Sequence, residues 1–250
     1  MYMGTSSSHG GNKDKKGLLP NDYVKPIVSW QATKTEFSKY INGNGGSIRK
    51  TVSNYVKSSG GAGGLLKSSS SGIRATANIS KLFSAIQREG YEKTFESLGI
   101  EYQGKSAKEI CSDLVNYVSP PSTSKEDAVA REAAINAMSK IYQFIESNEL
   151  DIKALDRIDD DLMDEVMGTY VECYIWGRIL NDLEYCLEKH SDDIERTLHI
   201  EDEMKSYVSS VVDVAFHSPG IREKVFGNRT ISAGVEELYK KCYSALEDMK

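Results

Sequence analysis

Apolar side chains recur every three or four residues along most of this chain, and strict two-residue alternation is almost absent. The longest such stretch runs from Asp159 to His190 without a proline. This spacing places an apolar stripe along one face of an α-helix. We therefore expect an all-α protein, built as a helical bundle-like domain. Trp176 and Leu180 are predicted to lie buried within that bundle.

The ends of several predicted helices carry local signals. Ser29 precedes a periodic stretch over residues 30–41, which the glycines and asparagines of residues 42–46 end. Ser106, followed by Glu109 three residues later, has the pattern of a capping box. The Pro120-Pro121 pair ends the helix that follows. These signals predict helices at the corresponding positions.

Two segments are poor in core-forming residues. Residues 1–28 are rich in Gly, Ser, Asn and Lys, so we expect a disordered N-terminal tail. Eleven of the fifteen residues at 58–72 are Gly or Ser, and the segment is interpreted as a flexible junction or a backbone-rich cradle. The chain is thereby divided into the tail (1–28), a basic helical region containing the junction (29–99) and an acidic α-helical domain (100–250).

The formal net charge of −6 conceals an uneven distribution. Residues 1–90 contain thirteen Lys/Arg and four Asp/Glu, whereas the remainder contains eighteen and thirty-three. A basic half can bind nucleic acid through phosphate contacts, and Lys50, Lys57, Lys67 and Arg74 are the residues expected to do so. In the alternative interpretation, the two halves of opposite charge face each other within one fold.

No catalytic or metal centre emerges from the residue pattern. Residues 61–68 resemble a phosphate-binding loop, but Leu66 replaces the glycine that should precede the lysine. Cys186 and His190 have the i, i+4 spacing of two metal ligands without a second pair. We therefore expect a non-enzymatic protein without metal or cofactor, whose four scattered cysteines stay reduced.

The chain has neither an apolar run long enough to span a membrane nor a signal peptide, so we expect a cytoplasmic protein. If translation starts at Met3, removal of that methionine leaves Gly4 as a free terminal amine. The segment that follows is small and hydroxyl-rich, which suits an extended peptide entering a partner's pocket. The predicted modification site is Gly4, and the predicted partner-binding residues are Gly4, Thr5, Ser6, Ser7, Ser8, His9, Gly10 and Gly11.

Several segments together resemble the B component of the bacterial Qat antiphage defence system. They are residues 3–11, Trp30 to Tyr40, Ser58 to Gly64, Val118 to Pro121, Glu126 to Ala133 and Arg178 to Asp182. The resemblance implies a non-catalytic subunit that works with a QueC-like deazaguanine enzyme, an ATPase and a TatD-like nuclease. QueC-like enzymes of defence operons are associated with joining a 7-deazaguanine carboxylate to a protein's N-terminal glycine. Here Met1-Tyr2 precedes the motif, which is a departure from that pattern.

The leading hypothesis is therefore a scaffold in an antiphage complex, which acts as N-terminal-glycine acceptor or docking partner for the QueC-like enzyme. The alternative is a nucleic-acid-binding adaptor that uses the basic N-terminal half.

Overall fold

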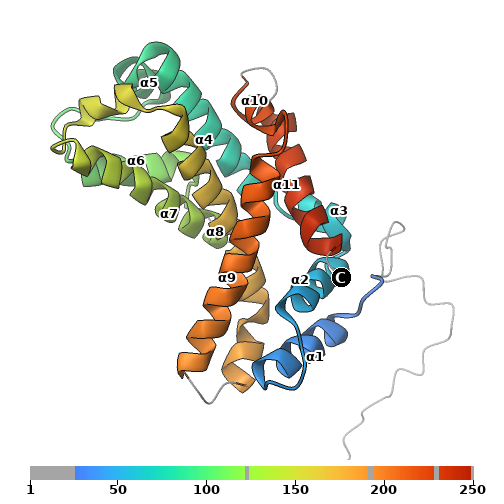
Figure 1. Ribbon diagram of the computed structural model, residues 1–250. Helices are drawn as coiled ribbons and strands as arrows, with labels where there is room; N and C mark the ends of the chain where they lie inside the picture. The colour runs from blue at the N-terminus through green and yellow to red at the C-terminus, as the bar shows by residue number, and fades with distance from the viewer. Residues whose placement is uncertain (1–25, 122–123, 191–193, 228–230, 249–250) are drawn as a thin grey trace, which may run out of the picture.

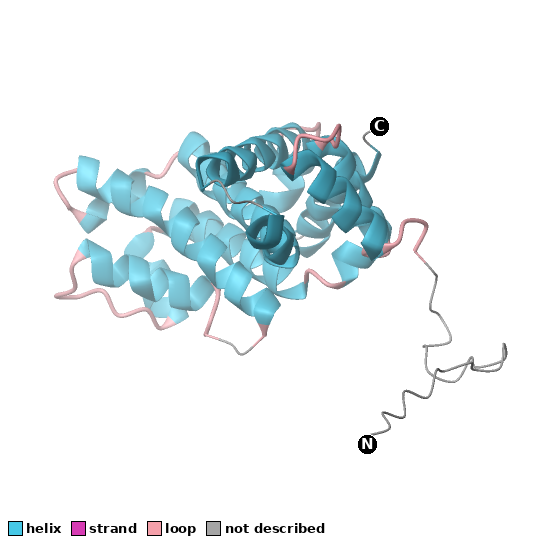
Figure 2. Cartoon of the chain, turned by 90° about the horizontal axis from the view of Figure 1, so that it is seen from below, coloured by secondary structure: helices cyan, strands magenta, loops and turns pink. Residues whose placement is uncertain are grey.

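The computed structural model describes residues 26–121, 124–190, 194–227 and 231–248, and this part of the chain is helical with no strand (Figures 1 and 2). The all-α prediction is thus confirmed. The helices are α1 (Trp30–Ile41), α2 (Ile48–Ser58), α3 (Gly61–Lys67), α4 (Ser70–Glu89), α5 (Tyr91–Leu98), α6 (Ala107–Val118), α7 (Lys125–Ser147), the 3₁₀ helix η1 (Ile152–Arg157), α8 (Asp160–His190), α9 (Ile194–Phe216), α10 (Ile221–Phe226) and α11 (Ile231–Asp248).

The long helix α8 forms the centre of the molecule. It packs against α7, α9, α1 and α4. Helices α5 to α7 lie on one side of α9 and helices α1 to α3 with α11 on the other (Figure 1). Because α8 contacts helices on both sides, it buries a broad band of its surface rather than a narrow stripe.

Helix α11 joins the acidic C-terminal region to the basic N-terminal region. It packs against α2, α3, α4, α9 and α10. Its buried side chains include Leu238, Tyr239 and Leu246, and they belong to the same core cluster as Val52 and Phe83. The compositional boundary near residue 100 therefore does not separate two hydrophobic cores among the described residues.

Local capping follows the sequence signals. The Ser29 hydroxyl accepts a hydrogen bond from the Ala32 amide, and α1 ends at Ile41. Ser106 and Glu109 form the expected capping box at the start of α6. These caps satisfy amide groups that the first helical turn leaves without partners.

The Gly/Ser-rich segment is not a flexible junction. It forms α3 and the start of α4, and Leu65 and Ser69 within it are almost fully buried. The absence of side chains allows a close approach, because a Cβ atom on Gly64 would lie only 2.4 Å from the Ser59 carbonyl oxygen. Tertiary contacts with α2 and α11 thus outweigh the low helix propensity of glycine.

The burial predicted for Trp176 and Leu180 is wrong in part. Both side chains are only half-buried at the edge of the core. The fully buried face of α8 instead passes through Tyr174, Ile175 and Ile179. Helical periodicity alone did not distinguish the fully buried face from the half-buried one, because the central part of α8 has apolar residues around most of its circumference.

Candidate functional site

The predicted site residues Gly4 to Gly11 lie outside the described residues, as does the rest of the expected tail up to Lys25. The described chain begins at Pro26, and the next residue, Ile27, is 92% exposed. Ser29 then caps α1. The connection to the preceding segment therefore lies at the surface, at the start of α1.

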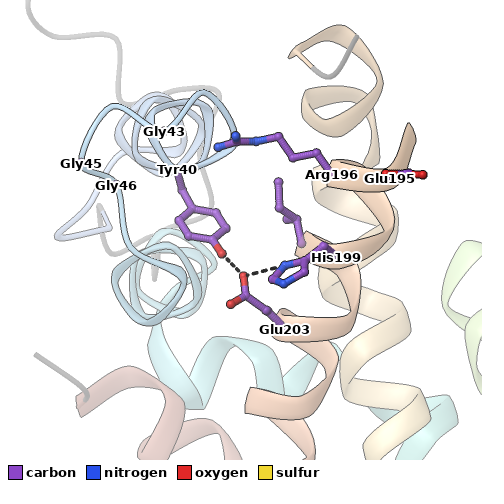
Figure 3. Close-up of a pocket in the computed structure, with 9 residues that line it drawn as sticks. Tyr40, Gly43, Gly45, Gly46, Glu195, Arg196, His199 and Glu203 are labelled. Atoms are coloured by element: carbon purple, nitrogen blue, oxygen red, sulfur yellow. Dashed lines mark hydrogen bonds and ion pairs between the residues drawn. The ribbon is translucent and has the colours of Figure 1, made fainter. Parts of the chain in front are cut away.

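A cleft of about 710 Å³ lies between the α1–α2 turn and the N-terminal half of α9 (Figure 3). The turn forms one wall and follows a path that only glycine readily allows. Gly43 and Gly45 have φ angles of +70° and +81°, and a Cβ atom on Gly46 would lie 2.3 Å from the Tyr40 amide nitrogen. The sequence analysis treated these glycines only as a helix stop, and their role in forming a cleft depends on the distant helix α9.

Three polar side chains meet in this cleft. The Tyr40 hydroxyl donates to Glu203 Oε2, and His199 Nδ1 lies 3.4 Å from the same oxygen (Figure 3). Desolvation, with the hydrogen bond to Glu203 and its negative charge, raises the pKa of Tyr40 to about 12. Tyr40 therefore remains a hydrogen-bond donor at neutral pH. A phenol that stays protonated in this way is not poised for nucleophilic chemistry.

A second polar cluster, here called the junction network, surrounds the α3–α4 junction. Arg178 on α8 donates to the Ser68 carbonyl oxygen at 3.0 Å and to the Ser69 hydroxyl at 2.7 Å. The Ser69 hydroxyl also lies 2.8 Å from that of Tyr243 on α11. Burial raises the pKa of Tyr243 to about 12, so this phenol stays protonated. The network fixes the junction against α8 and α11.

Glu126 on α7 completes the junction network at the start of α4. Its carboxylate accepts hydrogen bonds from the Ser71 amide and from the Tyr174 hydroxyl, both at 2.7 Å. A carboxylate at a helix N-terminus satisfies free amides and interacts favourably with the helix dipole. Two of the segments that carry the Qat resemblance, those starting at Glu126 and at Arg178, are therefore held near each other here, on either side of Ser68 to Ser71.

The other sequence candidates do not assemble into a catalytic or metal site. Residues 61–67 form α3 rather than a phosphate-binding loop. Cys186 is buried, and the side chain of His190 lies outside the described residues. Within the described ranges, no group of three or more His, Cys, Asp or Glu side chains is placed to hold a metal ion.

The basic residues proposed for nucleic-acid binding are distributed over different surfaces. Lys50 pairs with Glu36 at 3.2 Å, and Lys57 donates to the Ser53 hydroxyl at 2.8 Å. Lys67 and Arg74 line a separate hollow between α3, α4 and α11. The four residues therefore do not form one binding surface.

A sequence model of the family described as "Qat anti-phage system associated protein QatB" matches residues 60–246. The match covers most of the helical structure, including the junction network and α11. The chain belongs to the QatB family. The resemblance found in the sequence is thereby confirmed, and the chain is a component associated with the Qat anti-phage system. The matched range begins after α2, so it includes neither the N-terminal segment nor the α1–α2 turn.

Comparison of this QatB-family chain with curated proteins and with solved structures gave no match. A search of the described helices for one long and apolar enough to cross a membrane also found none.

Proposed function

We propose that this protein is a non-catalytic scaffold of the Qat system, and that it presents Gly4 as an acceptor to a QueC-like enzyme in the cytoplasm. The same helical body would hold the Qat ATPase and the TatD-like nuclease as further partners. Family membership supports a role in antiphage defence. The assignment of Gly4 as an acceptor rests on the N-terminal motif of residues 3–11 and on the exposed position of Ile27 at the start of the helical body.

The observation that carries the proposal is the exposed start of the helical body. Ile27 is 92% exposed and Ser29 caps α1, so the body begins at the surface. The 22 residues from Gly4 to Lys25 precede it. Such a segment can span at most about 75 Å when fully extended. That length is sufficient for a terminal glycine to enter the active site of a separate, docked enzyme.

The chemistry favours a terminal amine over lysine. An α-amine has a reference pKa of about 7.7–8.0, whereas a lysine amine has one of about 10.4, so the terminal amine has the larger neutral, nucleophilic fraction at pH 7. In the proposed step, the glycine nitrogen bonds to an activated carboxylate carbon of the 7-deazaguanine. The leaving group departs with its electron pair, and the nitrogen loses a proton to give an amide.

Intact-mass spectrometry of the protein, purified with and without the QueC-like partner, tests this proposal. We expect a chain that begins at Gly4 and carries an added group only when the partner is active. Gly4→Pro should abolish both the added mass and phage protection while leaving the helical circular dichroism unchanged. As a matched control, Lys13→Arg with Lys15→Arg should retain the added mass. A mature chain that begins at Met1, or an unmodified Gly4 in protected cells, would overturn the acceptor role.

A further inference from the structure

A basic groove runs along α4, on the side that faces the start of α11. Two adjoining hollows of about 520 and 550 Å³ share Lys81 and Ser232 in their walls. Lys67 and Arg74 line the first hollow, and Arg88 lines the second. We refer to these joined hollows as the α4 groove.

The cations of the α4 groove follow a regular spacing. Arg74, Lys81 and Arg88 are seven residues apart on α4, which places them on nearly the same helix face. At 1.5 Å per residue they extend over about 21 Å. At about 3.4 Å per nucleotide, this length corresponds to roughly six nucleotides of a stacked strand. A row of evenly spaced positive charges is suited to a linear polyanion.

The groove retains a positive surplus after its internal ion pairs are considered. All four basic side chains are exposed, while Glu89 and Glu236 are the only acidic residues in the described lining. Among the described residues, the side chains of Lys67 and Lys81 form neither an ion pair nor a hydrogen bond. Arg74 pairs with Asp127 at 3.3 Å and Arg88 with Glu89 at 3.4 Å. Both guanidinium groups are more than half exposed, although the Asp127 carboxylate is only 14% exposed. Ion pairs made by exposed cations contribute little energy, so a phosphate can compete for these guanidinium groups.

The groove also contains groups that suit bases. The half-buried ring of Tyr117 and the side chain of Leu98 line its second hollow. Asn78 and Ser232 add amide and hydroxyl groups in the first. Proteins that bind single strands combine a basic track with an aromatic ring on which a base stacks. An acidic peptide would gain from the cations but would have no base to place on the ring.

We infer that the α4 groove binds the phosphate backbone of a single-stranded nucleic acid, with one base stacked on Tyr117. The strand would lie along α4, with its phosphates near Lys67, Arg74, Lys81 and Arg88. This binding site is independent of Gly4 and of any modification at the N-terminus. The inference restricts nucleic-acid binding to the α4 groove, and Lys50 and Lys57 lie outside that groove.

Fluorescence anisotropy with a labelled oligothymidine of about 20 nucleotides, longer than the groove, tests the inference. With four phosphate contacts and about 0.7 counterions released per contact on a single strand, log K should fall with log salt at a slope of about −3. Affinity should therefore fall roughly fiftyfold between about 50 and 200 mM NaCl. Absence of binding at the lower salt concentration would overturn the proposal.

Variants assign any binding to the groove. Lys67→Glu with Lys81→Glu should weaken binding about tenfold or more and reduce the magnitude of the slope by about 1.4. If that variant does not fold, the corresponding glutamine pair should give the same direction. Lys39→Glu with Lys108→Glu makes the same change in charge at exposed positions outside the groove and should have little effect. An equal loss in both pairs would show that binding is nonspecific and would refute the groove.

Two further measurements separate a nucleic acid from an acidic peptide. Tyr117→Ala should weaken oligothymidine binding by about fivefold to a hundredfold, as loss of a stacking ring does, while Tyr117→Trp should preserve it. Polyglutamate of equal charge should compete poorly. If polyglutamate competes as well as the oligonucleotide, the site is one for acidic protein segments and the inference is wrong. If the alanine variant binds normally, no base stacks on Tyr117 and the inferred binding mode is wrong.

Discussion

Replacement of Gly72 by alanine should destabilise the protein, although alanine is the better helix former. Gly72 is the third residue of α4 and packs against the ring of Tyr174 on α8. A Cβ atom at this position would lie 2.4 Å from Tyr174 Cε1 and Cζ. Carbon atoms in favourable contact are separated by about 3.5–4.0 Å. The ring would therefore have to move by about 1 Å or more.

The fully buried Tyr174 ring has little room for that movement. Its hydroxyl donates to Glu126 at 2.7 Å, and Glu126 in turn accepts the Ser71 amide at the start of α4. Overpacking costs about 1–3 kcal/mol, and loss of one hydrogen bond adds about 1 kcal/mol. The gain in helix propensity, at most about 1 kcal/mol, offsets part of this cost. We expect a net loss of about 1–3 kcal/mol.

Thermal unfolding followed by circular dichroism measures the effect. A chain of this size loses roughly 2–4 °C in Tm per kcal/mol, so Gly72→Ala should lower Tm by about 2–12 °C. The matched control is Gly168→Ala on α8, where a Cβ atom would meet nothing within 4 Å. That variant should raise Tm by about 2–4 °C, because alanine is favoured in an unobstructed helix.

A double-mutant cycle identifies the cause. In a Tyr174→Ala background the obstructing ring is absent, so Gly72→Ala should cost less than about 0.5 kcal/mol. If Gly72→Ala stabilises the wild-type protein as Gly168→Ala does, the close contact between α4 and α8 is not present and the argument fails.

Three other outcomes follow from the described contacts. Arg178→Met should reduce the free energy of unfolding by about 1–3 kcal/mol in chemical denaturation, because the buried Ser69 hydroxyl and the Ser68 carbonyl lose a charged donor. Unchanged stability would contradict the junction network. The pKa of Tyr40 in the folded protein, about 12, lies above the reference value of about 10, so the stability that Tyr40 contributes is present below pH 10 and is lost as pH rises through 12. The wild-type protein should therefore lose stability over that pH range, whereas Tyr40→Phe should not. Parallel pH profiles of stability for the two proteins would refute the assignment. Trp176→Ala should reduce stability by only about 1–2 kcal/mol, because the Trp176 ring is half-buried. Phe83→Ala, at a fully buried position, should reduce it by about 3–5 kcal/mol. Equal losses of Tm in the two variants would count against the observed orientation of α8.

The sequence by itself determined the properties that depend on near neighbours. Helical periodicity predicted the all-α fold, and the caps at Ser29 and Ser106 placed the starts of α1 and α6 at the residues where the structure has them. These signals succeed because helical hydrogen bonds and capping contacts join residues three or four positions apart. The resemblance to the Qat component was also evident from the residues alone, and the family match confirmed it.

Tertiary structure decided the properties that depend on distant segments. The Gly/Ser-rich segment resembled a linker because its own residues bury little apolar surface, yet α8 and α11 supply the partners that hold it as α3 and the start of α4. The cleft beside Tyr40 requires Glu203, and the α4 groove requires Ser232, each more than 140 residues away in the chain. Periodicity shows that a residue faces one side of a helix. Only packing against other helices determines whether that side is buried, half-buried or open to a ligand.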